Sequence, residues 1–100
     1  MRPIPLKLRK QLANDGFMTR CIYEGCSSIP EWEHAWVFAG KQINERWAIV
    51  PVCAFHHRGD GLDKSYNRFV ALSRATPEEL AKYPRVDWKQ QYKYLKNKYA

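Results

Sequence analysis

The sequence has few cysteines, few acidic residues and no long apolar run. Its 100 residues include three cysteines, Cys21, Cys26 and Cys53. An odd number of cysteines in so short a chain argues against a disulfide framework, and no apolar run approaches the roughly 20 residues that a membrane span needs. The basic, proline-broken N-terminal segment also differs from a secretory signal. We therefore expect an intracellular, cytoplasmic protein that keeps its thiols reduced and does not associate with membranes.

Acidic residues are outnumbered, since the chain has ten Asp and Glu but 17 Lys and Arg, and its formal net charge is +7. Such an excess is typical of proteins that bind a polyanion, and we expect this polyanion to be DNA. An anionic membrane surface is a weaker alternative, which only a basic amphipathic helix would support. The length indicates a single domain over residues 1–100. A chain of this size buries a modest core, so a bound metal would matter for its stability.

Hydrophobic patterning predicts a short N-terminal helix, two strands and three further helices, which together indicate an α+β fold. The first helix begins near Leu6 and ends near Gly16, since glycine readily adopts the positive φ of a helix end. The segment from Thr76 to Glu79 matches a capping box with proline at the first helical position. The other elements are strands over 31–38 and 46–52, paired as a hairpin across a loop of about eight residues, and helices starting near Asp60 or Gly61 and at Trp88.

Two pairs of metal-binding residues stand out, Cys21-x4-Cys26 and Cys53-x2-His56. Together they supply three thiolates and one imidazole, a closed set that structural zinc prefers, whereas magnesium and calcium prefer oxygen. The alternative is three buried free cysteines and an ordinary histidine. The spacing favours structural Zn²⁺. Zinc binds finger peptides with an apparent free energy of roughly 10–16 kcal/mol, so its removal should unfold the central region.

Glu33, His34 and His57 lie beside these pairs and suit the hydrolysis of a phosphodiester bond. The zinc pairs bracket the predicted hairpin, so they would bring His34 and His57 onto one small unit. A neutral histidine can deprotonate water at neutral pH, and a carboxylate with an imidazole can hold a divalent cation. Adjacent residues of a regular strand point to opposite faces, so Glu33 and His34 need a bulge or twist to share one site. The alternative is a histidine packed between Trp32 and Trp36, next to a solvated glutamate.

Glu33-His34 and the later segment 48–57, AIVPVCAFHH, together resemble the HNH (ββα-metal) endonuclease family. That family has an acidic residue and a histidine, then an asparagine-led strand that ends in Cys-x2-Cys-His, and many members add an upstream cysteine pair. The resemblance covers roughly residues 21–67. It implies a zinc-stapled ββα-metal core over about 19–75 with flanking helices, including an extension over about 76–100.

The same resemblance implies a metal-dependent DNA endonuclease or nickase, of a kind often carried by phages and mobile elements. By this likeness His34 is the general base, and Glu33 and His57 are the ligands of a catalytic Mg²⁺ or Mn²⁺. This cation is distinct from the structural zinc.

The chain departs from the family pattern at two positions. His56 stands where the second cysteine of the pair usually falls, a change that zinc tolerates. Ala48 occupies the position of the middle asparagine, and alanine cannot make the hydrogen bonds that brace the loop carrying the base. Asn44, nearby in the predicted loop, is a candidate substitute. Asn67 is either a further metal ligand or, as we expect, an exposed helix residue.

Basic residues around the candidate site are expected to contact phosphates, with binding that weakens steeply as salt rises. They are Arg58, Lys41, Arg46, Lys64 and Arg68. The alternative for each is an ordinary solvated charge. Two other functions compete with the nuclease. One is a zinc-stabilised nucleic-acid-binding module without catalysis, which Ala48 favours, and the other is a module whose aromatic C-terminal helix binds a protein partner.

Overall fold

Two small antiparallel sheets and five α-helices form the part of the chain, residues 4–38 and 40–99, that the computed structural model describes. The elements are α1 (Leu6–Ala13), the 3-10 helix η1 (Gly16–Thr19), β1 (Pro30–His34), β2 (Val37–Phe38), β3 (Lys41–Gln42), the 3-10 helix η2 (Arg46–Ala48), β4 (Ile49–Cys53), α2 (Ala54–Arg58), α3 (Lys64–Arg74), α4 (Pro77–Leu80) and α5 (Trp88–Tyr99). The predicted α+β class is confirmed. None of the described helices is long and apolar enough to cross a membrane.

Strands β1 and β4 form the antiparallel ribbon that the sequence predicts. Pro30 pairs with Cys53 and His34 pairs with Ile49, in a regular register. Every residue of β4 is buried, as expected of a strand covered on both faces. The ribbon therefore places the beginning of α2 beside the beginning of β1.

The two predicted strands are shorter than expected. The first ends at His34, and the two residues that follow, Ala35 and Trp36, are both buried in the core. The chain resumes as β2, at the end of the predicted strand, and pairs at once with β3, which lies in the predicted hairpin loop. The second strand begins only at Ile49. Before it, the Ala48 N–H donates to the Glu45 carbonyl and closes the turn of η2.

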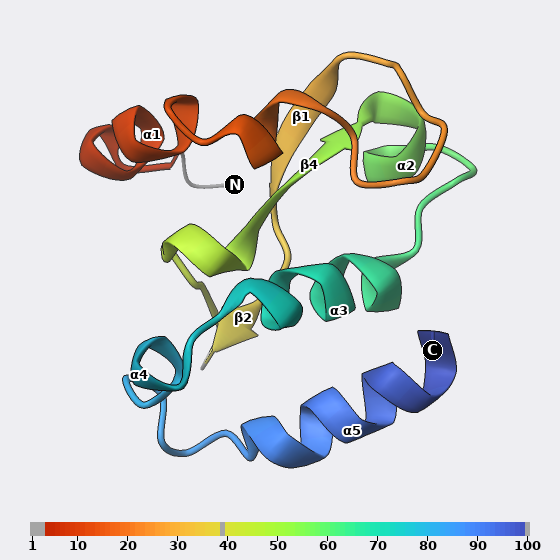
Figure 1. Ribbon diagram of the computed structural model, residues 1–100. Helices are drawn as coiled ribbons and strands as arrows, with labels where there is room; N and C mark the ends of the chain where they lie inside the picture. The colour runs from red at the N-terminus through yellow and green to blue at the C-terminus, as the bar shows by residue number, and fades with distance from the viewer. Residues whose placement is uncertain (1–3, 39, 100) are drawn as a thin grey trace.

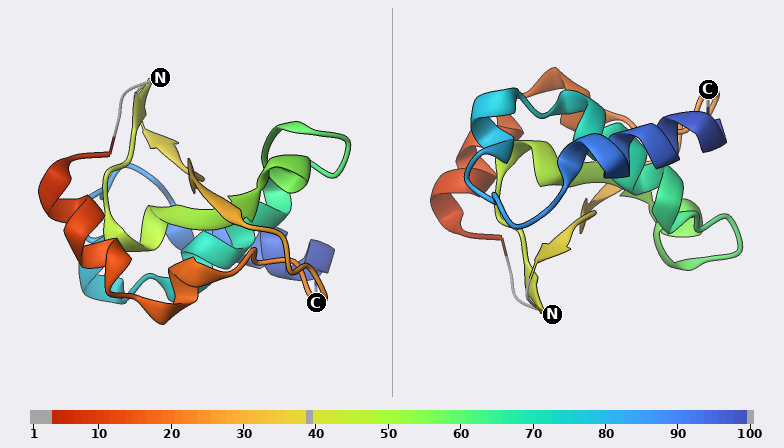
Figure 2. Two further views of the ribbon diagram at one scale, coloured as in Figure 1. Left: turned by 90° about the horizontal axis from the view of Figure 1, so that it is seen from above. Right: turned by 90° about the horizontal axis from the view of Figure 1, so that it is seen from below.

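The helices cover the ribbon from two sides (Figure 1). Helix α3 packs against β4 and η2, and α5 packs against α3. Helix α1 and η1 lie against the opposite face of the ribbon. Figure 2 shows that α2 lies at the end of the molecule opposite α1 and α4. The candidate site residues of α2 are therefore well separated from both of these helices.

Helix termini follow the predicted signals in all but two regions. Helix α1 ends at Ala13 with Asn14 as its C-cap, and Gly16 begins η1 without the positive φ expected of a helix end. The capping box at Thr76 is present, with Pro77 at the first position of α4, and the predicted C-terminal helix is α5. The helix expected to begin near Asp60 or Gly61 is α3, which begins later, at Lys64, and the separate short helix α2 precedes it. Helix α3 starts after Asp63, because the carboxylate of this residue accepts the Tyr66 N–H.

Two hydrophobic clusters share β4. One cluster packs Ile49 against side chains of α1 and η1. The other packs Val50 and Val52, which point to the opposite face, against α3 and α5. Both clusters therefore hold the strand that leads directly into the candidate metal-binding residues.

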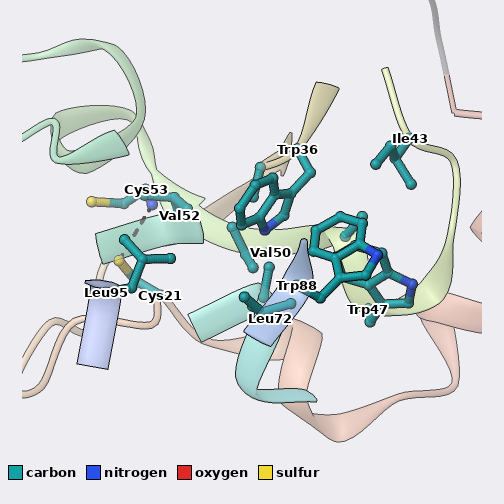
Figure 3. Close-up of a cluster of buried hydrophobic side chains, with 13 residues drawn as sticks. Cys21, Trp36, Ile43, Trp47, Val50, Val52, Cys53, Leu72, Trp88 and Leu95 are labelled. Carbon is teal, nitrogen blue, oxygen red and sulfur yellow. Dashed lines mark hydrogen bonds between the residues drawn. The ribbon is translucent and has the colours of Figure 1, made fainter. Parts of the chain in front are cut away.

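The larger cluster connects an aromatic end to a thiol end (Figure 3). At the aromatic end, Trp36 and Trp47 meet the Trp88 ring edge-on, with centroids 5.3 and 5.5 Å away. At the thiol end lie Cys21 and Cys53, joined by a hydrogen bond from the Cys53 N–H to the Cys21 sulfur. The candidate metal centre thus forms one wall of the core.

Candidate metal centre and the adjoining polar site

Four metal-binding side chains meet at one end of the ribbon. They are Cys21 and Cys26 before β1, Cys53 at the end of β4 and His56 in α2, and their ligand atoms all lie within 4.8 Å of one another. The Sγ atoms of Cys26 and Cys53 are 3.7 Å apart. His56 Nδ1 lies 3.5 Å from the sulfur of Cys21 and 3.2 Å from that of Cys53.

These distances suit a single tetrahedral ion. With bonds of about 2.3 Å to sulfur and 2.0 Å to nitrogen, the ligand atoms around zinc lie roughly 3.5–3.8 Å apart. Two of the three pairs above have this spacing, and the third is slightly shorter. The donor set and its geometry fit a structural metal such as zinc, and we call these four residues the Cys3His cluster.

Tight turns hold the two cysteines of the loop before β1. Gly25 has a φ of 76°, in the left-handed region that favours glycine. The Cys26 N–H donates to the Tyr23 carbonyl at 3.1 Å. The Cys53 N–H donates to the sulfur of Cys21 at 3.4 Å, a bond that favours the thiolate. The loop therefore presents both sulfurs toward the end of β4.

The surroundings of the cluster orient its histidine and affect its thiols. The Tyr23 ring stacks on the His56 ring at 3.9 Å with an angle of 11° between planes, which holds the imidazole in place. Burial raises the pKa of the Cys21 thiol, whereas a backbone hydrogen bond from Ser28 lowers the pKa of Cys26. A bound cation would favour the deprotonated form of each thiol.

Glu31 and Glu33 share the face of β1 that looks toward α2 and α3. The two oxygens of Glu31 accept hydrogen bonds from His57 Nδ1 at 2.8 Å and from Arg58 at 2.7 Å. These bonds, that of His57 first, lower the pKa of Glu31. An ionised carboxylate only accepts, so His57 Nδ1 carries a hydrogen, and in the neutral ring Nε2 is the nitrogen that has the lone pair. Glu31 was not among the site residues predicted from the sequence, although strand alternation places it on the same face as Glu33.

Glu33 is half-buried beside Asn67 of α3. Asn67 Nδ2 donates to Glu33 Oε2 at 2.7 Å, and Asn67 Oδ1 accepts from the Tyr23 hydroxyl at 3.1 Å. Burial raises the pKa of Glu33, and the charge of His57, the Asn67 hydrogen bond and the charge of Lys64 offset part of this rise. The expectation that Asn67 is an exposed helix residue is wrong. It is 1 % exposed, because α3 turns it toward the ribbon.

His34 lies on the opposite face of β1 from Glu33. The register pairs Glu33 with Val50 and His34 with Ile49, so β1 contains no bulge that would bring the two side chains together. His34 Nε2 lies 2.7 Å from Asn44 Oδ1. A carbonyl oxygen only accepts, so Nε2 carries the hydrogen and Nδ1 keeps its lone pair.

Asn44, rather than residue 48, supplies the amide next to His34. Ala48 is fully buried in η2, and its carbonyl accepts the Ala35 N–H at 2.8 Å. The position that corresponds to the family's asparagine therefore serves the packing of the chain just after β1. The candidate substitute that the sequence offered, Asn44, lies in hydrogen-bonding contact with the candidate base.

The ligand atoms of the polar site are more loosely grouped than those of the Cys3His cluster. Over residues 4–38 and 40–99, that cluster is the one group of three or more Cys, His, Asp or Glu whose ligand atoms come within 4.8 Å of each other. Glu31, Glu33 and His57 share one face of the molecule without forming such a group.

The predicted phosphate-binding residues differ in their surroundings. Arg46 is held within the protein, where it donates to the Arg74 carbonyl at 3.0 Å and to Glu79 at 2.8 Å. It links η2 to α4, so its guanidinium already has partners within the protein. The remaining four residues are exposed, namely Arg58, Lys41, Lys64 and Arg68.

No model of a known protein family matches this chain, and no curated protein or solved structure matches it significantly.

Proposed function

We propose that this protein is a metal-dependent DNA endonuclease or nickase of the HNH type. One observation carries the proposal. The Cys3His cluster joins α2 to the β1–β4 ribbon, and His57 of α2 contacts the acidic face of the strand that also bears His34. Phosphodiester hydrolysis needs a base for water and groups that bind a cation near the phosphate, and these residues are candidates for both roles.

Glu33 and His57 are the proposed ligands of the catalytic cation. Glu31 accepts a hydrogen bond from Nδ1 of His57 at 2.8 Å, so in the neutral ring the lone pair of Nε2 is left to bind a cation. A carboxylate with an imidazole suits Mn²⁺ or Mg²⁺. When bound, such a cation stabilises charge on the phosphate and on the leaving oxygen.

His34 is the proposed general base. Its Nδ1 would take a proton from water while the water oxygen attacks phosphorus and the bond to the leaving sugar oxygen breaks. Asn44 accepts a hydrogen bond from the other ring nitrogen, Nε2. In this tautomer Nδ1 has the lone pair that a base needs. Strand β1 pairs with β4 along one edge. A phosphate at the other edge would have access to side chains from both faces of β1.

A zinc-stabilised nucleic-acid-binding module without catalysis is the second candidate. Two observations favour it: Glu33 and His34 lie on opposite faces of β1, and a buried alanine occupies position 48. The net charge of +7 suits both functions. The two candidates differ in cleavage and agree on DNA binding.

Nicking of supercoiled plasmid by the zinc-loaded protein tests the proposal. We expect nicking that requires added Mg²⁺ or Mn²⁺ and is lost in His34→Ala. Asn44→Ala should slow nicking without abolishing it, because the base remains while its tautomer is no longer held. Glu24→Gln, in the exposed loop before β1, is a control that should nick as the wild type does.

Each other outcome points to a different conclusion. Equal nicking by wild type and His34→Ala would exclude His34 as the base. A folded wild type that binds plasmid but never nicks it would favour the binding module. A protein with no salt-dependent DNA binding would exclude both candidates and favour a protein-interaction module.

A further inference from the structure

Asn67 is the one polar side chain that is fully buried among the residues that the structure describes. Its neighbours on α3, Ala71 and Leu72, are buried apolar residues of the core. Burial of a carboxamide is unfavourable unless both of its ends find hydrogen-bond partners. A leucine at this position would avoid that cost, so the amide needs an explanation beyond packing.

The partners of Asn67 determine how its amide is oriented. The Glu33 carboxylate can only accept, so it requires the Nδ2 end, which donates to it at 2.7 Å. The Oδ1 end then accepts from the Tyr23 hydroxyl at 3.1 Å. The Tyr23 hydroxyl also lies 3.4 Å from the Asp63 carbonyl, but this contact is longer than its hydrogen bond to Asn67. The hydrogen bonds therefore run in one direction, from Tyr23 through Asn67 to Glu33.

The same tyrosine reaches the Cys3His cluster. Its ring stacks on His56 at 3.9 Å, while its hydroxyl donates to Asn67. A continuous path of contacts thus joins a ligand of the structural metal to the carboxylate on the acidic face of β1. The path consists of His56, Tyr23, Asn67 and Glu33.

We propose that Asn67 is a positioning residue that aims the Glu33 carboxylate, and that Tyr23 ties this positioning to the Cys3His cluster. The inference rests on the proposed role of Glu33 as a cation ligand. Asn67 itself does not bind the cation, because both polar ends of its amide are engaged. Residues that orient a metal ligand typically change metal affinity by roughly 10- to 100-fold when they are replaced.

Binding of Mn²⁺ to the zinc-loaded full chain, followed by electron paramagnetic resonance, tests the inference. Asn67→Leu should weaken Mn²⁺ binding by roughly 10- to 100-fold while zinc content stays at one per chain. Tyr23→Phe keeps the stacked ring and removes only the hydroxyl, so it should weaken binding in the same direction by less. Tyr94→Phe, which removes an exposed hydroxyl of α5, is the matched control and should change nothing.

Unchanged Mn²⁺ affinity in folded, zinc-loaded Asn67→Leu would overturn the inference, because a purely structural asparagine would alter stability alone. A second readout is the side-chain NH₂ signal of Asn67 in ¹H–¹⁵N NMR spectra. Both Glu33→Gln and Tyr23→Phe should shift this signal, and Tyr94→Phe should not.

The NMR readout separates failure of the inference from failure of the proposed function. If the wild type binds no Mn²⁺ and does not nick DNA, the proposed function fails. The Asn67 signal then decides the inference alone. Shifts in both variants would support the tie from Tyr23 to Glu33, and an unmoved signal would overturn it.

Discussion

His57 Nδ1 of α2 lies 2.8 Å from the Oε1 atom of Glu31 on β1. The pair joins a helix to a strand across 26 positions of sequence. Arg58, the next residue of α2, donates to the other oxygen of the same carboxylate at 2.7 Å. Glu31 therefore holds two consecutive side chains of α2, and one of these is the proposed cation ligand.

Replacement of Glu31 by alanine should impair the proposed cation site. Without its acceptor, His57 can exchange tautomers and rotate, so Mn²⁺ affinity and nicking should fall by roughly 10- to 100-fold. Mn²⁺ titration and plasmid nicking measure the two effects. Glu24→Ala, a loop carboxylate on the surface, is the control. Wild-type Mn²⁺ affinity in Glu31→Ala would show that the pair only fixes α2 to β1.

The adjacent histidines should respond to substitution in opposite ways. His56→Ala removes a ligand of the Cys3His cluster, so we expect loss of zinc and of much of the far-ultraviolet circular dichroism. The reason is that structural zinc contributes roughly 10–16 kcal/mol in finger peptides. His57→Ala should keep both zinc and fold but lose metal-dependent nicking. Zinc content measured by mass spectrometry separates the two, and equal zinc loss in both variants would contradict the assignment.

The ion pair between Asp15 and Arg74, at 2.6 Å, should make stability depend on pH. The hydrogen bond from the Phe17 N–H and the Arg74 guanidinium lower the pKa of Asp15, against the effect of burial. A lowered folded pKa contributes stability that is fully present above the unfolded pKa of about 3.9 and is lost as pH falls through the folded pKa.

Asp15→Asn should therefore reduce the free energy of unfolding at pH 7 by roughly 1–2 kcal/mol, since the pair is partly exposed. The difference from wild type should shrink below about pH 4. Urea unfolding at several pH values measures this, with the exposed Asp60→Asn as control. A difference that persists unchanged at low pH would mean that the charge of Asp15 is not responsible.

Lys64 should contribute one phosphate contact, because it is exposed and its charge reaches Glu33 in the proposed site. Lys64→Ala should make the slope of log affinity against log salt shallower by about 0.9. Lys82→Ala, in which the lost ammonium lies 3.6 Å from Glu45, should leave the slope unchanged. Fluorescence anisotropy with labelled duplex DNA measures both slopes, and equal slopes for the two variants would exclude Lys64 from the interface.

Local rules were enough to predict several elements of this fold. The capping box at Thr76 and the C-terminal helix from Trp88 depend on residues within one or two turns. The end of the first strand after His34 and the turn around Trp47 were not predictable in this way. Both follow from the burial of Trp36 and Trp47 against Trp88, which is distant in the sequence.

The two parts of the candidate site also differed in how far local sequence predicts them. Spacing alone predicted the Cys3His cluster, because ligands a few residues apart stay close wherever the chain turns. The partner of His57 depends on where α2 lies along β1, and the pattern of residues does not predict this placement. The burial of Asn67 depends likewise on which side of α3 faces the ribbon.

Strand β4 separates the two hydrophobic clusters and belongs to both. Neither cluster can be opened to water without uncovering one side of this strand, so the two halves of the core should melt in one cooperative transition. The amide hydrogens of Val50 and Val52 should then exchange with solvent only through global unfolding. The segment that leads into the metal ligands would be the slowest-exchanging part of the molecule.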